Sequence, residues 1–404
     1  MHIRPILSAL SRHRASTLLI ALEIALACAV LCNACFLIGD RLASMRVDSG
    51  VDEASLAVVR LDGYDEQPAA DLNARILAGL RAIPGVQSVA VVNAVPFGPR
   101  AGTAGVQLDS EGKRFGEVID FYLGGPDALD TLGARVVAGR APGVDDYQPV
   151  ESFLPADARV LVTRALAQRL WPDSDPLGQE FWTGDYHFRV MGVLDGLVIP
   201  APGGRNRNDA HWSVFVPTQP GPGLAGNYLV KAAPGDLPRV LRDAREAVPA
   251  IAPGVVLDEE QTATIGELRE RYFQRDRAMA GLMVGVIVAL LLVTALGIVG
   301  LSSFWVTQRR RQIGVRRALG ATRGDILRYF QVENFLIVSG GVVLGMLLAY
   351  GLNQGLMMRY ELPRLPALYL PAGAAVLWLL GQVSVLAPAR RATRVSPAEA
   401  TRSI

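Results

Sequence analysis

The side chains best suited to catalysis are few and scattered. Four histidines are spread along the chain without a His-Glu-x-x-His pattern, and no Gly-x-Ser-x-Gly motif occurs, so neither that kind of zinc site nor a nucleophilic serine is indicated. A P-loop needs Gly-x-x-x-x-Gly-Lys-Ser/Thr, in which backbone N–H groups and one lysine hold phosphates. The only lysines, Lys113 and Lys231, follow no such loop. We therefore expect no catalytic, cofactor-binding or metal-binding residues in this chain, and no ATPase activity of its own.

Two polar or reactive features lie in the first apolar segment. Cys28, Cys32 and Cys35 are spaced i, i+4, i+7, which places them on one helical face, and we interpret them as small packing residues against lipid or another helix. Glu23 is costly inside a bilayer, so a functional role has to be considered. It lies about two turns from Arg14, however, and snorkelling or neutralisation explains it equally well.

Arginine spacing carries more information. Seven arginines fall between residues 309 and 328, interleaved with Ile313, Leu319 and Ile326. This pattern is typical of a short helix lying along a membrane surface, and basicity alone would make it a topology anchor attracted to anionic lipid. The arginine clusters lie close to apolar segments and lack interleaved aromatic residues, so a nucleic-acid partner is not expected.

The elements that must position these residues are membrane-spanning helices. Half of the 404 residues are hydrophobic and they are concentrated in blocks, as in a membrane protein. A spanning helix needs about 20 apolar residues. The first block could also be a signal peptide ending in Ala-Cys-Ala, but it continues to Ile38, too long for such a segment, so we expect an uncleaved anchor. The predicted spans are 15–39, 278–306, 331–352 and 368–388.

Charge distribution predicts the orientation. The arginine-rich segments 1–14, 307–330 and 389–404 fall on one side of four spans, and short basic segments stay in the cytoplasm. Residues 40–277 contain 24 basic and 33 acidic residues, a net charge of −9. We therefore expect a bacterial inner-membrane protein with cytoplasmic termini, an exported domain at 40–277 and a short exported loop at 353–367.

The exported segment is predicted to be an α+β domain. Two strand–helix–strand units, each with a Pro-Gly-Val turn after its helix, predict a duplicated βαβ lobe with halves at 52–97 and 222–260. The region between them, 98–218, is an inserted lobe in which Thr163 is suited to cap a short helix. A capping box from Thr264 to Glu267 predicts the start of a stalk helix at 264–277. We expect this stalk to continue into the second span, the alternative being a break near Arg277.

The order of residues also resembles a known family. Arg310 to Ala321 run Arg-Arg-Gln-Ile-Gly-Val-Arg-Arg-Ala-Leu-Gly-Ala, which looks like the signature loop of MacB/FtsX-type ABC permeases, with Gln312 where that family has Glu. Glu333 falls where the family commonly has an acid. Residues 160–178 are similar to a segment of the MacB periplasmic core domain. The tail resembles the family's ending, with Thr401 in place of Leu, and its motif residues are Pro388, Arg390, Arg391, Pro397 and Glu399.

The resemblance implies a permease subunit that converts ATP hydrolysis in a separate cytoplasmic ATPase, which would bind ATP-Mg, into movement of the exported domain. Export of an antibiotic, peptide or lipid-like substrate is the leading interpretation. A periplasmic membrane-fusion adaptor and an outer-membrane channel are then further expected partners. The alternatives are a regulatory complex that activates an envelope hydrolase, as cell-division members of the family do, and lipoprotein release.

The same resemblance implies the site residues. The loop would dock on the ATPase, with Ile313, Leu319 and Ile326 packing into a groove and the arginines meeting acidic rims. A second permease copy or a paralogue is an expected partner, and close helix contact is permitted by Gly281, Gly285, Gly341 and Gly345. The expected coupling set is Arg309, Arg310, Arg311, Ile313, Gly314, Arg316, Arg317, Ala318, Leu319, Gly320, Ala321 and Ile326.

Overall fold

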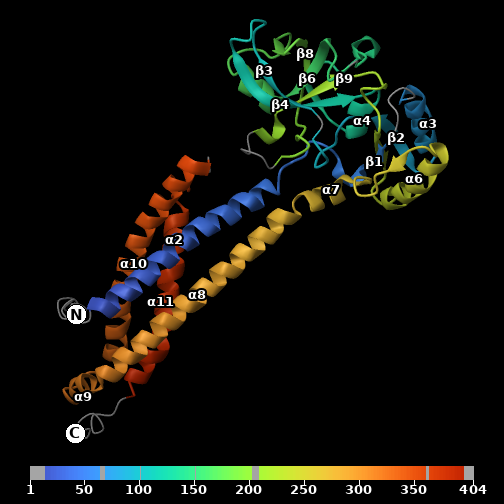
Figure 1. Ribbon diagram of the computed structural model, residues 1–404. Helices are drawn as coiled ribbons and strands as arrows, with labels where there is room; N and C mark the ends of the chain where they lie inside the picture. Colours follow the sequence, from blue (N-terminus) through green and yellow to red (C-terminus); the bar gives the residue numbers. More distant parts are fainter. Residues whose placement is uncertain are drawn as a thin grey trace. The chain divides into compact units, whose positions relative to one another are not determined.

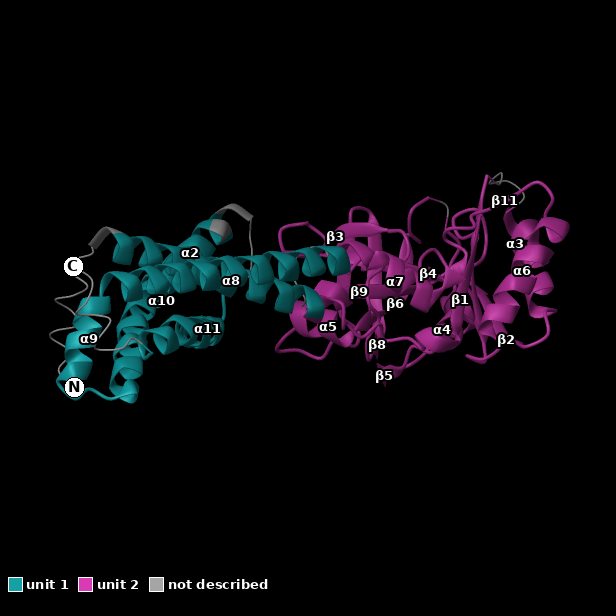
Figure 2. Cartoon of the chain, turned by 90° about the horizontal axis from the view of Figure 1, so that it is seen from below, with its two compact units in different colours: residues 1–42, 276–404 teal, residues 43–275 magenta. Residues whose placement is uncertain are grey.

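The computed structural model describes residues 14–63, 69–100, 102–150, 152–202, 209–360 and 364–394. These residues fall into two compact units (Figure 2), one within residues 1–42 and 276–404 and the other within 43–275. We call the first the helical unit and the second the α/β unit.

Long apolar helices build the helical unit (Figure 1). Among the described residues, four helices are long and apolar enough to cross a membrane, as predicted. All four contribute to one buried cluster, represented by Ile24, Ile298, Val338 and Leu377. The long helices are α2 (Arg14–Ser44), α8 (Gln274–Gln308), α10 (Arg323–Tyr360) and α11 (Tyr369–Ala392), and the short α9 (Arg310–Ala318) lies between α8 and α10 in the chain.

The long helices extend beyond the expected spans. Helix α10 begins at Arg323, so the end of the segment expected as a loop, 307–330, forms its first turns. Helix α11 continues to Ala392, four residues past the expected end. Hydropathy detects only the part of a helix that suits lipid, whereas the backbone hydrogen-bond ladder continues through polar turns until something interrupts it.

The predicted pair of βαβ units is confirmed in the smaller sheet of the α/β unit. Its strands lie in the order β11, β1, β10, β2, with β12 paired to β1, and every neighbouring pair is antiparallel. Strands β1 and β2 are therefore parallel with β10 between them, which is a split βαβ arrangement. The elements are β1 (Leu56–Asp62), α3 (Ala69–Arg81), β2 (Val86–Val91), β10 (Asn227–Ala232), α6 (Leu237–Ile251), β11 (Val256–Leu257) and β12 (Ala263–Thr264).

The strands of this sheet carry apolar side chains on both faces, and each face is buried in a hydrophobic cluster. Val59 and Tyr228 belong to the cluster that includes α3 and α6, two helices that pack on each other (Figure 1). Leu56 and Leu229 belong to a second cluster, which the inserted lobe shares. The two lobes are thus joined by a common core.

The inserted lobe is a small closed barrel. Its strands follow the order β5, β8, β6, β9, β4, β3, β7, and β7 pairs again with β8, so the sheet closes and loses most of its exposed edge. Thr163 caps α5, as predicted, with Oγ1 accepting from the N–H of Leu166 at 3.4 Å. The elements are β3 (Thr103–Gln107), β4 (Phe115–Gly124), α4 (Ala128–Leu132), β5 (Val136–Gly139), β6 (Asp157–Thr163), α5 (Arg164–Leu170), β7 (Glu180–Thr183), β8 (Tyr186–Leu194) and β9 (Ser213–Pro217).

The expected stalk, 264–277, is interrupted. The capping box is present, because Thr264 Oγ1 accepts from the N–H of Glu267 at 3.1 Å and the Glu267 carboxylate accepts from the N–H of Thr264 at 3.0 Å. Helix α7 (Ile265–Tyr272) then ends at Phe273, whose φ is −89° and ψ is 6°. The Phe273 ring is buried, with its centroid 5.9 Å from that of Phe97. The helix expected to run unbroken into the second span is therefore interrupted at Phe273, four residues before Arg277, near which the alternative had placed the break.

Candidate functional site

Helix α9 is set off from the helices on either side of it. Arg309, with φ −100° and ψ 12°, separates it from α8. Gly320 ends the segment with a φ of +96°, a conformation that glycine adopts without the steric penalty of a Cβ. Helix α10 starts with a capping Thr322, whose Oγ1 accepts from the N–H of Asp325 at 3.2 Å. The arginine-rich loop therefore presents one short helix between two breaks.

One face of α9 is buried within the chain itself. Ile313 of α9 and Ile326 of α10 are each 5% exposed and pack in a cluster with Val306, Phe330 and Ala389. The expectation that these two isoleucines insert into an ATPase groove is therefore corrected, because both are buried in the cluster in which α9 packs against α8, α10 and α11. The amphipathic pattern was sound, but a buried apolar face and a docking face look alike in sequence.

The opposite face of α9 is open. Arg311 and Val315 of α9 and Leu319, the residue directly after it, follow one another at four-residue spacing on this side, and Leu319 is 83% exposed. We call these three residues the α9 stripe. Arg316 is also exposed, and its guanidinium carbon lies 4.7 Å from the centre of the Tyr329 ring, within cation–π range. Of the other expected residues, Arg310, Ala318 and Gly320 are exposed, Arg317 and Ala321 are half-buried, and Gly314 is buried.

Arg309 has a different role from the one expected. Its side chain is 10% exposed and its Nη1 donates to both carboxylate oxygens of Glu333, at 2.8 and 3.0 Å. A guanidinium buried and paired within the chain in this way presents little surface to an acidic rim on a partner. Sequence reasoning noticed both residues without pairing them, because 24 positions separate them and no local rule links their helices.

The tail motif lies at the end of α11. Pro388 is buried inside the helix, and Arg390 and Arg391 are exposed in its last turn. Basic residues there suit the negative end of the helix dipole. Pro397 and Glu399 lie outside the described residues.

The expected glycine pairs divide into two kinds. A Cβ on Gly345 would lie 2.4 Å from Cys28 Cβ and 2.7 Å from the Ala25 carbonyl oxygen, and one on Gly341 would lie 2.8 Å from the Ala21 carbonyl oxygen. This pair therefore permits close contact with α2 of the same chain. Gly281 and Gly285 have nothing within 4 Å of the corresponding position.

A second polar junction, missed in the sequence, lies in the α/β unit. Arg269 of α7 donates to the carbonyl oxygens of Met45, at 2.9 Å, and Val47, and it forms an ion pair with Glu53. Its guanidinium carbon also lies 5.0 Å from the centre of the Phe97 ring. One side chain thus ties the segment that enters the unit after α2 to the helix that leaves it before α8.

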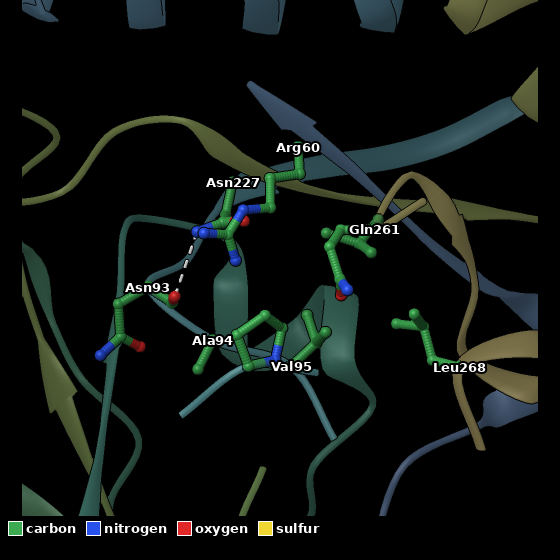
Figure 3. Close-up of a pocket in the computed structure, with 9 residues that line it drawn as sticks. Arg60, Asn93, Ala94, Val95, Asn227, Gln261 and Leu268 are labelled. Carbon is green, nitrogen blue, oxygen red and sulfur yellow. Dashed lines mark hydrogen bonds between the residues drawn. The ribbon is translucent and has the colours of Figure 1, made fainter. Parts of the chain in front are cut away.

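The hollow drawn in Figure 3 is too small for a substrate. Asn93 and Asn227 meet beside it, the Asn227 amide donating to the Asn93 carbonyl oxygen at 3.1 Å. Arg60, Gln261 and Leu268 complete much of the wall. Its volume of about 10 Å³ suits one water molecule at most. The described part of the chain holds no group of three or more His, Cys, Asp or Glu side chains that could bind a metal ion.

Two family descriptions match this chain. One, the MacB-like periplasmic core domain, matches residues 17–248, and the other, the FtsX-like permease C-terminal domain, matches residues 284–397. The two matches reach into both units described above and leave residues 249–283 between them.

Individual relatives are more distant. The macrolide export ATP-binding/permease protein MacB of Shewanella sp. is 27% identical over 295 residues, which is 68% of this chain and 42% of that protein. The uncharacterized ABC transporter permease YknZ of Bacillus subtilis is 25% identical over 261 residues, 62% of this chain and 63% of that protein. The chain thus spans about two-fifths of the length of this MacB relative.

Two solved structures were also found. The periplasmic region of MacB from Actinobacillus actinomycetemcomitans aligns with a TM-score of 0.35 at 13% identity, covering 52% of this chain and 89% of that one. The extracellular domain of YknZ from Gram-positive bacteria aligns with a TM-score of 0.32 at 18% identity, covering 50% and 98% respectively.

Proposed function

Because this chain belongs to the family of MacB/FtsX-type ABC transporter permeases, we propose that it transmits the energy of ATP hydrolysis, performed by a separate ATPase subunit, to its α/β unit. In this proposal the ATPase binds and displaces α9. Helices α8 and α7 transmit that displacement along the chain, and the α/β unit changes its conformation in response. The ATP-Mg cofactor belongs to the partner and not to this chain.

The observation that carries the proposal is the α9 stripe. Leu319 is 83% exposed although it is a large apolar residue, and Val315 lies one turn before it. Such side chains at the centre of a contact, with arginines around them, are typical of protein interfaces. The stripe also precedes α10 and follows α8, so a partner bound there would act at the junction of two spanning helices.

The arginine distribution supports an orientation with α9 and both termini in the cytoplasm and the α/β unit in the periplasm. With this orientation, the family match over residues 17–248 supports export rather than regulation of an envelope enzyme. We propose an antibiotic, a peptide or a lipid-like molecule as the substrate class. A second permease copy or paralogue would complete the transporter, and a periplasmic adaptor with an outer-membrane channel would complete the route outward.

The docking surface is tested by co-purification with the candidate ATPase and by measuring stimulation of ATP hydrolysis. We expect Leu319→Asp and the double charge reversal Arg316→Glu with Arg317→Glu each to weaken binding and stimulation at least tenfold. Val144→Asp is a matched control, because Val144 is a 90% exposed apolar residue of the α/β unit. Intact binding and stimulation in both loop variants would contradict the assignment. An envelope hydrolase that co-purifies in place of an adaptor would favour regulation.

A further inference from the structure

The junction between α8 and α9 holds an ion pair that the docking role does not use. Arg309 lies between the two helices and is 8% exposed, while Glu333 of α10 is 1% exposed. The Arg309 Nη1 lies 2.8 and 3.0 Å from the two Glu333 oxygens, and the guanidinium carbon lies 5.7 Å from the centre of the Trp305 ring. A cation, an anion and an aromatic ring from three neighbouring segments thus meet in one buried place.

Burial at this junction has an electrostatic cost. Taking both charges out of water is expensive, and well-packed apolar residues of similar volume often stabilise a protein as much or more. A buried ion pair does select one arrangement, because any shift that separates the partners leaves uncompensated charges in a medium of low polarity. The pair is therefore better suited to fixing the position of α8 against α10 than to adding stability.

The place of this pair in the chain gives it a mechanical consequence. Arg309 is the residue at which the helical conformation is interrupted, so a displacement of α9 could bend the chain at this junction and not reach α8. Its backbone remains tied on both sides, since its N–H donates to Trp305 and its carbonyl oxygen accepts from Ile313, both at 3.0 Å. The side chain adds a direct ion pair from this junction to α10.

We propose that Arg309 and Glu333 are positioning residues that lock the α8–α9 junction to α10, so that a displacement of α9 moves α8 and is not absorbed at the junction. This proposal rests on the function proposed above. Without the lock, the ATPase would still bind the exposed stripe and hydrolyse ATP, but less of that motion would reach the α/β unit.

The first test needs no ATPase. Spin labels at Arg311→Cys on α9 and Arg328→Cys on α10, both exposed positions, report the distance between the two helices in the full chain in lipid nanodiscs. Cys28, Cys32 and Cys35 are replaced by alanine beforehand. We expect Glu333→Gln to widen the distance distribution at least twofold, because the neutral amide leaves the buried Arg309 guanidinium without its charged partner. The swap Arg309→Glu with Glu333→Arg should restore a narrow distribution. Arg310→Lys, at the exposed neighbouring position, should leave the distribution unchanged.

The second test measures coupling. In vesicles with the ATPase, Glu333→Gln should lower transport per ATP hydrolysed at least fivefold while ATPase binding stays within twofold of the native chain, and the charge swap should recover part of the loss. An unchanged distance distribution in Glu333→Gln would overturn the proposal. A wider distribution with unchanged transport per ATP would also overturn it, leaving a purely structural pair. Failure of the native chain to bind or stimulate the ATPase would instead contradict the proposed function, and it would not alter the spin-label result.

Discussion

At the scale of single residues, the α/β unit contains a carboxylate held between two cations. Asp146 is 5% exposed, and its Oδ1 accepts from Arg140 Nη2 at 2.8 Å and from Arg159 Nη1 at 3.5 Å. Its Oδ2 accepts from the N–H of Gly143 at 2.8 Å. The hydrogen bonds from Arg140, followed by the Gly143 N–H and the charges of both arginines, outweigh burial and lower the pKa of Asp146 to about 2.

This lowered pKa predicts a pH-dependent stability. A carboxyl group with a folded pKa below its unfolded value of about 3.9 contributes fully above that value, and the contribution is lost as pH falls through 2. We expect Asp146→Asn to reduce the free energy of unfolding by about 2 kcal/mol at pH 7, and the gap from the native chain to narrow by about 1 kcal/mol at pH 3.

Denaturant unfolding of the full chain in detergent at both pH values measures this gap. Asp145→Asn is the matched control, because Asp145 is the exposed neighbour, and its gap from the native chain should stay near zero. If the free energy of unfolding of Asp146→Asn differed from that of the native chain by the same amount at both pH values, the lowered pKa of Asp146 would be contradicted.

At the scale of elements, α2 owes its place in the helical unit to glycines on its neighbours. Gly345 of α10 lies against Cys28, and a Cβ on Gly373 of α11 would lie 2.5 Å from Cys32 Sγ. The face that carries these cysteines therefore packs on helices and does not face lipid, which resolves the two options left open by their spacing. Small residues allow such close approach, and packing contacts rather than a hydrophobic driving force hold helices together in a bilayer.

A glycine substitution tests this packing. In Gly345→Ala the new Cβ would meet the Ala25 carbonyl oxygen and Cys28 Cβ, atoms that cannot rotate away, so we expect a loss of about 1–3 kcal/mol. Gly285→Ala, which adds a Cβ in open space, should change stability by less than about 0.5 kcal/mol. Thermal melting of the two variants in detergent compares them. Equal melting temperatures would show that α2 and α10 are not packed as described.

At the scale of the whole molecule, two chain segments connect the helical unit to the α/β unit, through α2 and α8. In the helical unit, Arg41 and Asp276 form an ion pair near the ends of these helices. In the α/β unit, Arg269 ties the incoming segment at Met45 and Val47 to the outgoing α7. Non-covalent contacts thus join the two connecting segments within the helical unit and again within the α/β unit.

If the two connections must shift relative to each other during transport, a covalent link between them should stop it. We expect a cleavable thiol crosslinker joining Arg41→Cys to Asp276→Cys, in a chain with the three native cysteines replaced, to lower transport at least tenfold. Binding of the ATPase should not change, because the link is remote in sequence from α9. Transport is measured before linking, after linking and after cleavage of the linker. The measurement before linking shows the effect of losing the ion pair alone, which should be small because the pair is partly exposed. Full transport with the link intact would show that the two helices move together.

Much of this arrangement follows from local sequence. The four spanning helices come from apolar length, the βαβ pair from strand and helix periodicity with Pro-Gly turns, and the caps at Thr163 and Thr264 from side chains that reach backbone donors three residues away. These signals are local, because each depends on a short window of the chain. The loop from 309 to 328 is likewise evident from a local pattern, in which arginines are interleaved with apolar residues.

Only the tertiary structure decided what the residues of that loop do. Ile313 and Leu319 are both apolar residues of one short segment, yet one is buried and the other exposed, because α10 and α11 cover a single face of α9. The pairing of Arg309 with Glu333 and the contact of the Phe273 ring with Phe97 both join segments that are far apart in sequence. Local pattern therefore determined which elements form, and packing between elements determined which side chains are free to act.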